Sequence, residues 1–365
     1  MRVVDADSHV DENEETWSYL DDSERWFAPH TVVLAKGEVS SGGSRYWHFV
    51  DGLLRERRIR DDKRTGTTLE TRELLDVSAR LRHMDQLGVD IHVIYPTAFL
   101  TALTSRPDVD AGLCRSYNRW LSRKCAESGG RLRWVAMIPY LNMKAALDEV
   151  EYAVEHGAAG VMKKGLECGF RVAGDPYFYP VYDRASELGL AVCIHAASGD
   201  PAVSYLVSKP FAGMFPQVMP VAAACSSLLA ARVPQLFPKL RVGFIEAGAS
   251  WVPYILDDYW ARHDRQSVND MMARGSLDTN RRTDLFKGSR FYVAYQVQED
   301  LQYLLDLGLE DSLVIGTDYS HADQSADLNM LGTVKERARR GEVSETVVRK
   351  MLDENPSRLY GLAQQ

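Results

Sequence analysis

The chain has 365 residues, of which 45% are hydrophobic and 26% are charged, and its formal net charge is -8 at pH 7. This length and apolar content suit a folded protein with either one large α/β barrel or two ordinary domains. Lysine and arginine are scattered along an acidic chain, so the charge pattern argues against binding to nucleic acid or to an anionic membrane surface.

The chain shows neither a secretion signal nor a membrane span. Its amino terminus enters a charged strand directly, and no run reaches the roughly 18 uninterrupted apolar residues that a membrane span needs. The best candidate, residues 218–237, is broken by Ser226, Ser227, Arg232 and two prolines. Five cysteines without a CxxC pair argue against a disulfide framework and a cysteine zinc site. We therefore expect a cytoplasmic protein.

Eight short β-branched or apolar runs alternate with longer amphipathic segments along the chain. This alternation is typical of parallel strands that are buried on both faces and joined by helices. The predicted strands are residues 3–7, 91–96, 133–140, 158–164, 191–195, 241–247, 290–296 and 312–318. Helical segments such as 142–157 and 176–190 each end near a glycine, which favours helix termination there. The pattern predicts a single (β/α)8 TIM barrel spanning residues 1–365.

Two long segments interrupt this regular spacing. Residues 18–80 form a polar insertion after the first strand, and residues 196–238 form another after the fifth. Both leave from strand carboxyl ends, the face on which barrel active sites lie, so they are candidates for a lid. The alternative is a disordered or dimer-forming excursion.

Polar residues gather at the predicted strand ends, on the rim where a TIM barrel presents its catalytic groups. They come from the first, fifth, sixth and eighth strands: Asp7, His9, Glu12, His195, Glu246, Asp318 and His321. Taken singly, each has an ordinary structural explanation, such as a hydrogen-bonded histidine or an aspartate that caps a helix. Together they would bury a large excess of negative charge unless a cation were bound.

Nitrogen and oxygen donors without thiolate indicate Zn, Mn, Fe or Co rather than a soft-metal or cluster site. Lys163 and Lys164 end the fourth strand, where a modified lysine would be able to bridge two metals. The alternative is an ordinary lysine held in an ion pair at the rim.

Several motifs resemble the amidohydrolase-related branch of the amidohydrolase superfamily, the branch that includes aminocarboxymuconate-semialdehyde decarboxylase. They are "DADSHVDE", "YFYPVYDRASELGLAVCIH", "FIEAGASWVPYIL", "IGTDYSHAD" and "ENPSRLYGL", which cover nearly the whole barrel in the family's order. The resemblance implies a metal-dependent TIM barrel, commonly a homodimer. It also implies a single-metal ligand set at Asp7, His9, His195 and Asp318.

The chain departs from this family pattern at three positions. Family decarboxylases generally place a catalytic histidine after strand six, where this chain has Glu246; it also carries Glu12 and His321 in HxxE and DxxH arrangements. The resulting donor set has the capacity for two metal ions. Four carboxylates would also be only half neutralised by one divalent ion, which favours a second. The single-metal alternative makes Glu246 a general base and leaves Glu12 and His321 to orient the ligands.

Three functions follow from these features. The first prediction is a dinuclear non-heme iron monooxygenase, with Fe/Fe or Mn/Fe, that hydroxylates a small organic acid and uses Glu246 and His321 as catalytic residues. The resemblance implies this chemistry, because a small branch of the family uses such a site for oxygen-dependent hydroxylation; the spacing of the donors alone shows only the capacity to bind metal. The alternative is a metal-dependent hydrolase or non-oxidative decarboxylase of a carboxylic acid that uses Zn or Mn. A third possibility is a non-catalytic metal-binding subunit of a larger assembly. Neither nucleic acid nor a membrane is expected as a partner.

Overall fold

The structure, a computed structural model, describes residues 1–33, 45–56, 62–167, 169–199, 203, 215–264, 284–322 and 324–362. Within these ranges, four cysteines are buried and free, namely Cys114, Cys125, Cys193 and Cys225. No helix in the described ranges has both the length and the apolar character needed to cross a membrane.

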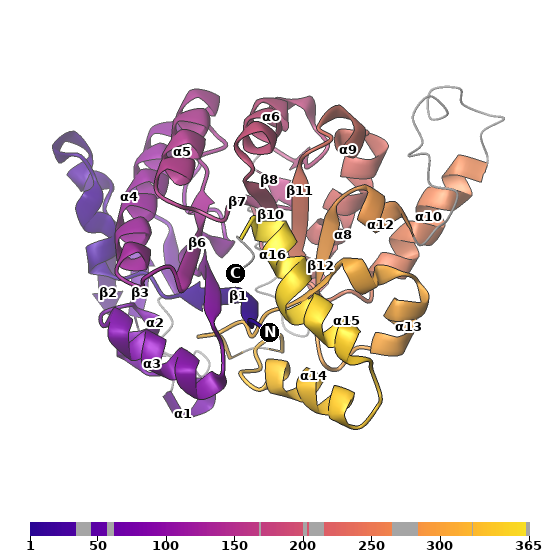
Figure 1. The fold of residues 1–365 in the computed structure, drawn as a ribbon. Helices are drawn as coiled ribbons and strands as arrows, with labels where there is room; N and C mark the ends of the chain where they lie inside the picture. Colours follow the sequence, from indigo (N-terminus) through magenta and orange to yellow (C-terminus); the bar gives the residue numbers. More distant parts are fainter. Residues whose placement is uncertain are drawn as a thin grey trace.

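Eight parallel strands form one sheet that curls into a nearly closed barrel, with the helices on its outside (Figure 1). Their order in the sheet is the order in the chain: β1 (Val4–Val10), β5 (Ile91–Pro96), β6 (Leu132–Met137), β7 (Gly160–Lys164), β10 (Ala191–His195), β11 (Arg241–Ile245), β12 (Phe291–Tyr295) and β13 (Leu313–Ile315). All eight predicted strands are present, and the predicted TIM-barrel fold is confirmed.

The strand boundaries differ from the prediction at functionally important ends. The first strand continues to Val10, so His9 lies within it rather than after it. The sixth and eighth strands end at Ile245 and Ile315, before Glu246 and Asp318. In the first strand polar residues break the apolar run while the backbone is still extended, whereas Glu246 and Asp318 leave the extended conformation, with φ of 62° and 50°.

The helices connect successive strands, as a right-handed crossover topology requires. The longer ones are α3 (Val77–Leu87), α4 (Pro107–Ala126), α5 (Met143–Glu155), α6 (Tyr179–Leu188), α8 (Phe215–Ala230), α10 (Val252–Asp264), α13 (Leu301–Asp306) and α14 (Met330–Arg339). The shorter ones are α1 (Asp62–Thr65), α2 (Leu69–Arg72), α9 (Val233–Leu236), α12 (Leu285–Gly288), α15 (Glu345–Arg349) and α16 (Asn355–Tyr360). Gly189 terminates α6 with φ of 71°, as its position after the apolar pattern predicts.

The barrel closes where β13 meets β1. The Asp318 amide donates to the Asp7 carbonyl at 2.9 Å, and the His9 amide donates to the Tyr319 carbonyl at 2.9 Å. Gly316 lies so close to β1 that a Cβ atom built on it would stand 2.1 Å from the Asp7 Cβ. Only a residue without a side chain fits at this seam.

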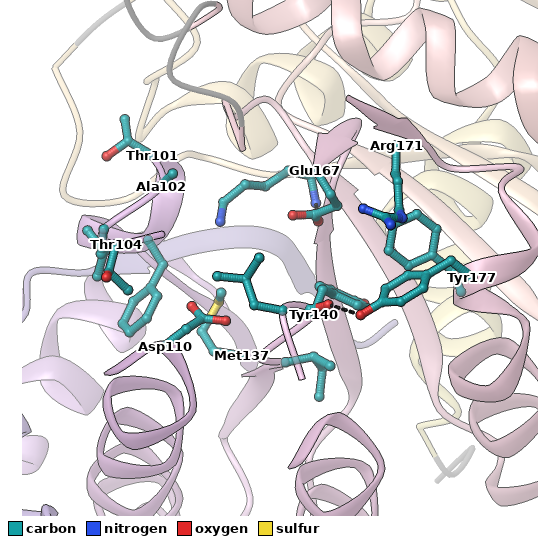
Figure 2. Close-up of a pocket in the computed structure, with 15 residues that line it drawn as sticks. Thr101, Ala102, Thr104, Asp110, Met137, Tyr140, Glu167, Arg171 and Tyr177 are labelled. Atoms are coloured by element: carbon teal, nitrogen blue, oxygen red, sulfur yellow. Dashed lines mark hydrogen bonds between the residues drawn. The ribbon is translucent and has the colours of Figure 1, made fainter. Parts of the chain in front are cut away.

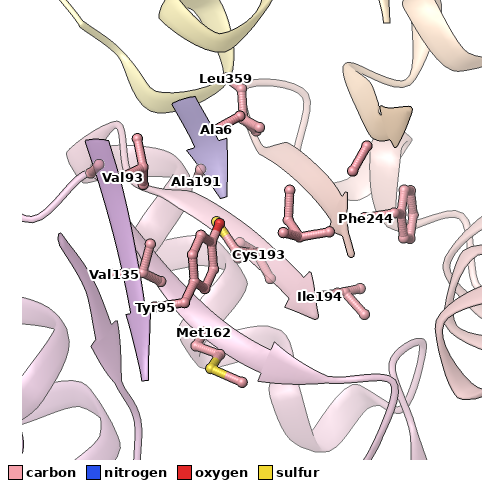
Figure 3. Packing of buried hydrophobic residues seen from close by; sticks show 14 of the residues in the cluster. Ala6, Val93, Tyr95, Val135, Met162, Ala191, Cys193, Ile194, Phe244 and Leu359 are labelled. Atoms are coloured by element: carbon pink, nitrogen blue, oxygen red, sulfur yellow. The ribbon is translucent and has the colours of Figure 1, made fainter. Parts of the chain in front are cut away.

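The barrel interior is filled by side chains that support the carboxyl-terminal rim. Figure 3 shows Tyr95 and Cys193 together inside the ring of strands. The Tyr95 hydroxyl lies 2.8 Å from the Tyr360 hydroxyl, which donates to the Ala6 carbonyl at 2.6 Å. The Tyr95 ring centroid lies 5.0 Å from that of His195, so this buried tyrosine packs beside a predicted ligand.

The predicted insertion after the first strand is a small structured unit in the ranges that the structure describes. It holds short 3-10 helices at Glu14–Tyr19 and Asp22–Phe27 and an antiparallel sheet of β2 (His30–Val33), β3 (Arg45–His48) and β4 (Leu54–Glu56). The second insertion contains α8 and α9, which occupy the ordinary place of a barrel helix. The predicted lid function is untested, and residues 200–202 and 204–214 of the second insertion lie outside the described residues.

We predict that Gly316→Ala destabilises the protein by about 3 kcal/mol or more, because the added methyl group must displace the backbone of β1. Urea unfolding measures the change. Gly332→Ala is the matched control: Gly332 lies in α14 with open space around it, so alanine there stabilises the helix by about 1 kcal/mol. Equal stabilities for the two variants would contradict the closely packed seam.

Candidate metal centre

His9 is fixed in one orientation near the end of β1. Its Nδ1 lies 2.9 Å from the Pro96 carbonyl of the adjacent strand, so Nδ1 carries the proton. This leaves Nε2 as the bare nitrogen. Nε2 lies 3.3 Å from Asp7 Oδ1 and 3.4 Å from Asp318 Oδ1, which places a lone pair between two carboxylates.

His195 ends β10 and has the same kind of arrangement. Its Nδ1 lies 3.1 Å from Glu246 Oε2 and 3.2 Å from the Ala196 carbonyl. Its Nε2 lies 3.4 Å from Asp7 Oδ1, the oxygen that also faces His9. The two imidazole rings meet edge to face with centroids 4.9 Å apart, so their Nε2 atoms converge on the Asp7 carboxylate.

Asp318 is held by two neighbours after β13. His321 Nδ1 lies 2.7 Å from Asp318 Oδ1, and the Ser325 hydroxyl donates to Asp318 Oδ2 at 3.0 Å. The same hydroxyl lies 3.1 Å from Glu246 Oε1, which makes Ser325 a link between the sixth and eighth strands. The His321 Nε2 lies 3.1 Å from the Thr97 hydroxyl.

Two of these acidic residues adopt unusual backbone conformations. Glu246 and Asp318 have φ of 62° and 50°, in the left-handed region that few residues other than glycine adopt. Such conformations cost free energy and occur often at functional sites, where the surrounding structure imposes them. Here they turn the chain just past two strand ends and aim both carboxylates into the barrel mouth.

The buried carboxylates and imidazoles perturb one another strongly. Burial alone raises the pKa of Asp7, but the neighbouring His195 and His9 outweigh burial and hold that pKa below its usual range. Burial lowers the pKa of His195, yet Glu246 and Asp7 outweigh it and raise that pKa. Burial lowers the pKa of His9. The site therefore favours an ionised Asp7 beside a neutral His9, which is the state that binds a metal ion.

The donor atoms form two overlapping groups in which all members lie within 4.8 Å of one another. One group is Asp7, His9, His195 and Glu246, and the other is His9, Glu246, Asp318 and His321. The structure thus brings six of the seven predicted ligands together. A set of buried imidazole and carboxylate donors fits a divalent metal ion, which would offset the cost of burying the negative charge.

Glu12 is the predicted ligand that the structure does not bring into either group. Its Oε1 accepts the Thr97 amide at 3.1 Å and its Oε2 accepts the Ala98 amide at 2.8 Å. Burial raises the pKa of this carboxyl to about 8. The HxxE spacing predicts that Glu12 lies beside His9. Instead, Glu12 lies beyond the end of β1, where the chain turns its side chain toward the loop after β5.

Several residues that shape the site were not recognised in the sequence. Ser325, Thr97 and the Pro96 carbonyl orient the donor side chains, and nothing in a single sequence distinguishes them from ordinary loop residues.

Lys163 and Lys164 lie at the end of β7, where the sequence leaves open a modified lysine that bridges two metals or an ordinary lysine in an ion pair. The structure buries Lys163 against the Phe178 ring, with Nζ 3.4 Å from its centroid and 3.5 Å from Glu167 Oε1. The ion-pair interpretation therefore fits Lys163.

Comparisons with known proteins agree with this architecture. Residues 47–362 match the Amidohydrolase family. A 2-amino-3-carboxymuconate-6-semialdehyde decarboxylase of Dictyostelium discoideum is 23% identical over 302 residues, covering 79% of this chain and 77% of that protein.

Solved structures have the same fold. An amidohydrolase from Mycobacterium avium subsp. paratuberculosis K-10 has a TM-score of 0.79 at 18% identity, covering 99% of this chain and 98% of its own. A 5-carboxyvanillate decarboxylase from Sphingomonas paucimobilis has a TM-score of 0.63 at 17% identity, and the match covers 78% of this chain and 82% of that one. A dihydroxybenzoic acid decarboxylase from Polaromonas sp. JS666, with bound manganese and an inhibitor, has a TM-score of 0.62 at 15% identity. The match covers 100% of this chain and 98% of that one.

We predict that Glu12→Ala and His195→Ala separate a structural role from a metal-binding role. Glu12→Ala leaves two backbone amides without their acceptors and costs about 2–4 kcal/mol in unfolding free energy, while the bound metal per chain is unchanged. His195→Ala removes a ligand and depletes the metal. Elemental analysis and urea unfolding measure both effects. Equal metal loss in the two variants would show that Glu12 is a ligand.

Proposed function

The chain belongs to the amidohydrolase family, and on that premise we propose that it is a metal-dependent decarboxylase that removes a carboxyl group from an aromatic or related unsaturated acid without an oxidant. One observation carries the proposal: Asp7 Oδ1 and Asp318 Oδ1 face the bare Nε2 of His9, and Asp7 also faces the Nε2 of His195. The names of the relatives support the reaction class, because they include decarboxylases of unsaturated and aromatic acids.

These donors suit one divalent ion, held by Asp7, His9, His195 and Asp318. The neighbouring residues fix the donors: Glu246 lies against the second nitrogen of His195, and His321 against Asp318. The charge argument for two ions weakens because Glu12, with its raised pKa and two amide partners, does not add to the cluster's charge. Three carboxylates, those of Asp7, Glu246 and Asp318, then remain near the ion, and one divalent ion neutralises two of their three charges.

A divalent ion held there supplies positive charge that draws electrons from a substrate oxygen. The chain's own residues must orient the acid, exclude water and deliver a proton. When the bond between the substrate carbon and its carboxylate breaks, carbon dioxide leaves and the electron pair stays on that carbon. We assign this proton to the carboxyl group of Glu246, whose Oε2 lies 3.1 Å from His195 Nδ1: in its protonated form Glu246 gives the proton to the carbon and then takes another from water.

The comparisons do not support the monooxygenase prediction. The relatives described above that have a named reaction are decarboxylases, and decarboxylation with a proton supplied by the protein requires no redox change at the metal. Membership of an enzyme family likewise gives no support to a non-catalytic subunit. The predicted homodimer and cytoplasmic location stay predictions.

Carbon dioxide release tests the reaction. We expect manganese- or zinc-loaded protein to decarboxylate at least one of 2,6-dihydroxybenzoate, 5-carboxyvanillate and 2-amino-3-carboxymuconate-6-semialdehyde, at the same rate with and without oxygen. Removing the metal abolishes the reaction. Glu246→Gln retains the metal, because the amide oxygen still accepts the His195 proton, but lowers kcat by about 10²- to 10⁴-fold, the usual contribution of general acid catalysis.

Ser325→Ala provides the comparison variant: it removes the hydroxyl that lies 3.1 Å from Glu246 Oε1 and 3.0 Å from Asp318 Oδ2, and it leaves both carboxyl groups in place. We expect a smaller loss in this variant than in Glu246→Gln. Oxygen consumption in proportion to product would contradict the proposal and favour the oxygenase. Full activity in Glu246→Gln would remove Glu246 from the proton path.

A further inference from the structure

A cavity of about 170 Å³ opens on the carboxyl-terminal side of β5, β6 and β7 (Figure 2). Figure 2 shows Glu167, Arg171 and Tyr177 on one side of it and Asp110, Thr104 and Thr101 on the other. Its walls come from the loop after β5, the end of β6, the β8–β9 hairpin (Leu166–Glu167 and Arg171–Val172) and the 3-10 helix Pro176–Phe178 that precedes α6.

Two structural links join this cavity to the metal centre. Lys164, which lines the cavity, pairs in register with His195 on the neighbouring strand, so their backbones lie about 4.8 Å apart. The loop after β5 makes the second link: Thr97 contacts His321, and residues 101–104 of the same loop line the cavity. The cavity and the metal centre therefore lie next to each other on the carboxyl-terminal rim of the barrel.

The ionisable groups around the cavity favour an anion. Glu167 is already engaged by the buried Lys163, with Nζ 3.5 Å from its Oε1, and by the Lys164 amide at 2.9 Å. Burial raises the pKa of the Asp110 carboxyl to about 7, which reduces its negative charge near neutrality. Lys164 and Arg171 add two positive charges, and neither forms an ion pair with any residue that the structure describes.

Aromatic side chains give the cavity flat walls. Arg171 lies over the Tyr177 ring, with its guanidinium carbon 4.5 Å from the ring centroid. The Tyr177 hydroxyl donates to the Tyr140 carbonyl at 2.7 Å, which fixes the ring in place, and Phe178 meets Tyr140 edge to face with centroids 5.4 Å apart. Rigid rings beside a guanidinium group suit a planar ligand that carries a carboxylate.

We propose that this cavity binds a second carboxylate of the substrate, held by Lys164 and Arg171, while the carboxyl group to be removed lies at the metal centre. The substrate class is therefore a planar dicarboxylic acid. This inference rests on the proposed function, because it assigns the first carboxylate to the metal. The spacing between the two carboxylates sets which acid fits both positions.

Binding measurements test the inference without turnover. Calorimetric titration of manganese-loaded protein compares benzoate with phthalate, isophthalate and terephthalate, which carry a second carboxylate at three different spacings. We expect the best of the three diacids to bind at least 10-fold more tightly than benzoate, the effect of a charge-assisted contact. Lys164→Gln and Arg171→Gln each reduce that advantage about 10-fold and leave benzoate affinity within twofold of the original.

Two further variants serve as controls. Asp110→Asn keeps the shape of the cavity and removes its remaining negative charge, so diacid affinity rises. Lys144→Gln removes an exposed lysine on α5, which pairs with Asp148 at 2.8 Å, and leaves all affinities unchanged. Thermal unfolding and metal content confirm that each variant is folded and loaded.

Two results would overturn the inference. The first is that no diacid binds more tightly than benzoate. The second is that folded, metal-loaded Lys164→Gln and Arg171→Gln keep the full diacid advantage, or weaken benzoate equally. Failure of the proposed decarboxylation would be visible separately, as absent carbon dioxide release in a protein that still prefers diacids.

Discussion

The candidate active site depends on the seam at which β13 closes the barrel against β1. Two backbone hydrogen bonds cross it, and Gly316 allows the strands to approach. Asp7 and His9 lie on one side of this seam and Asp318 and His321 on the other, separated by more than 300 residues of chain. Arg80 strengthens the seam from outside: it donates to the His9 carbonyl at 3.2 Å and stacks 3.5 Å from the centroid of the Tyr319 ring.

The second constraint is the orientation of the histidines. A metal-binding histidine almost always donates its other ring N–H to a fixed partner, which orients the ring. Pro96 provides that partner for His9, Glu246 lies in that position beside His195, and His321 directs Nδ1 toward Asp318. The acidic residue after strand six is thus explained by the imidazole that it faces. This gives Glu246 a role as a proton partner and weakens the case for a bridging ligand to a second ion.

The fold was predictable because buried parallel strands and amphipathic helices leave different periodicities, and each of the eight strand runs is continuous. Residues at strand ends were also predictable, since closing the barrel must bring them to one rim. Glu12 was not, because its position depends on where the backbone turns after Val10 and on the amides of Thr97 and Ala98. The cavity was also not predictable from the sequence. Lys164 and Arg171 line it together only because the chain folds into the β8–β9 hairpin, and strands of two residues are too short to show a hydrophobic periodicity.

We infer that Asp7, His9, His195 and Asp318 hold one divalent ion in the barrel mouth. Anomalous diffraction from crystals of the manganese-loaded protein tests it most directly. We expect one peak per chain, roughly 2.0–2.3 Å from the Nε2 atoms of His9 and His195 and from the carboxylate oxygens of the two aspartates. Two peaks of comparable height, or a peak bound by Glu12 instead of Asp7, would contradict it.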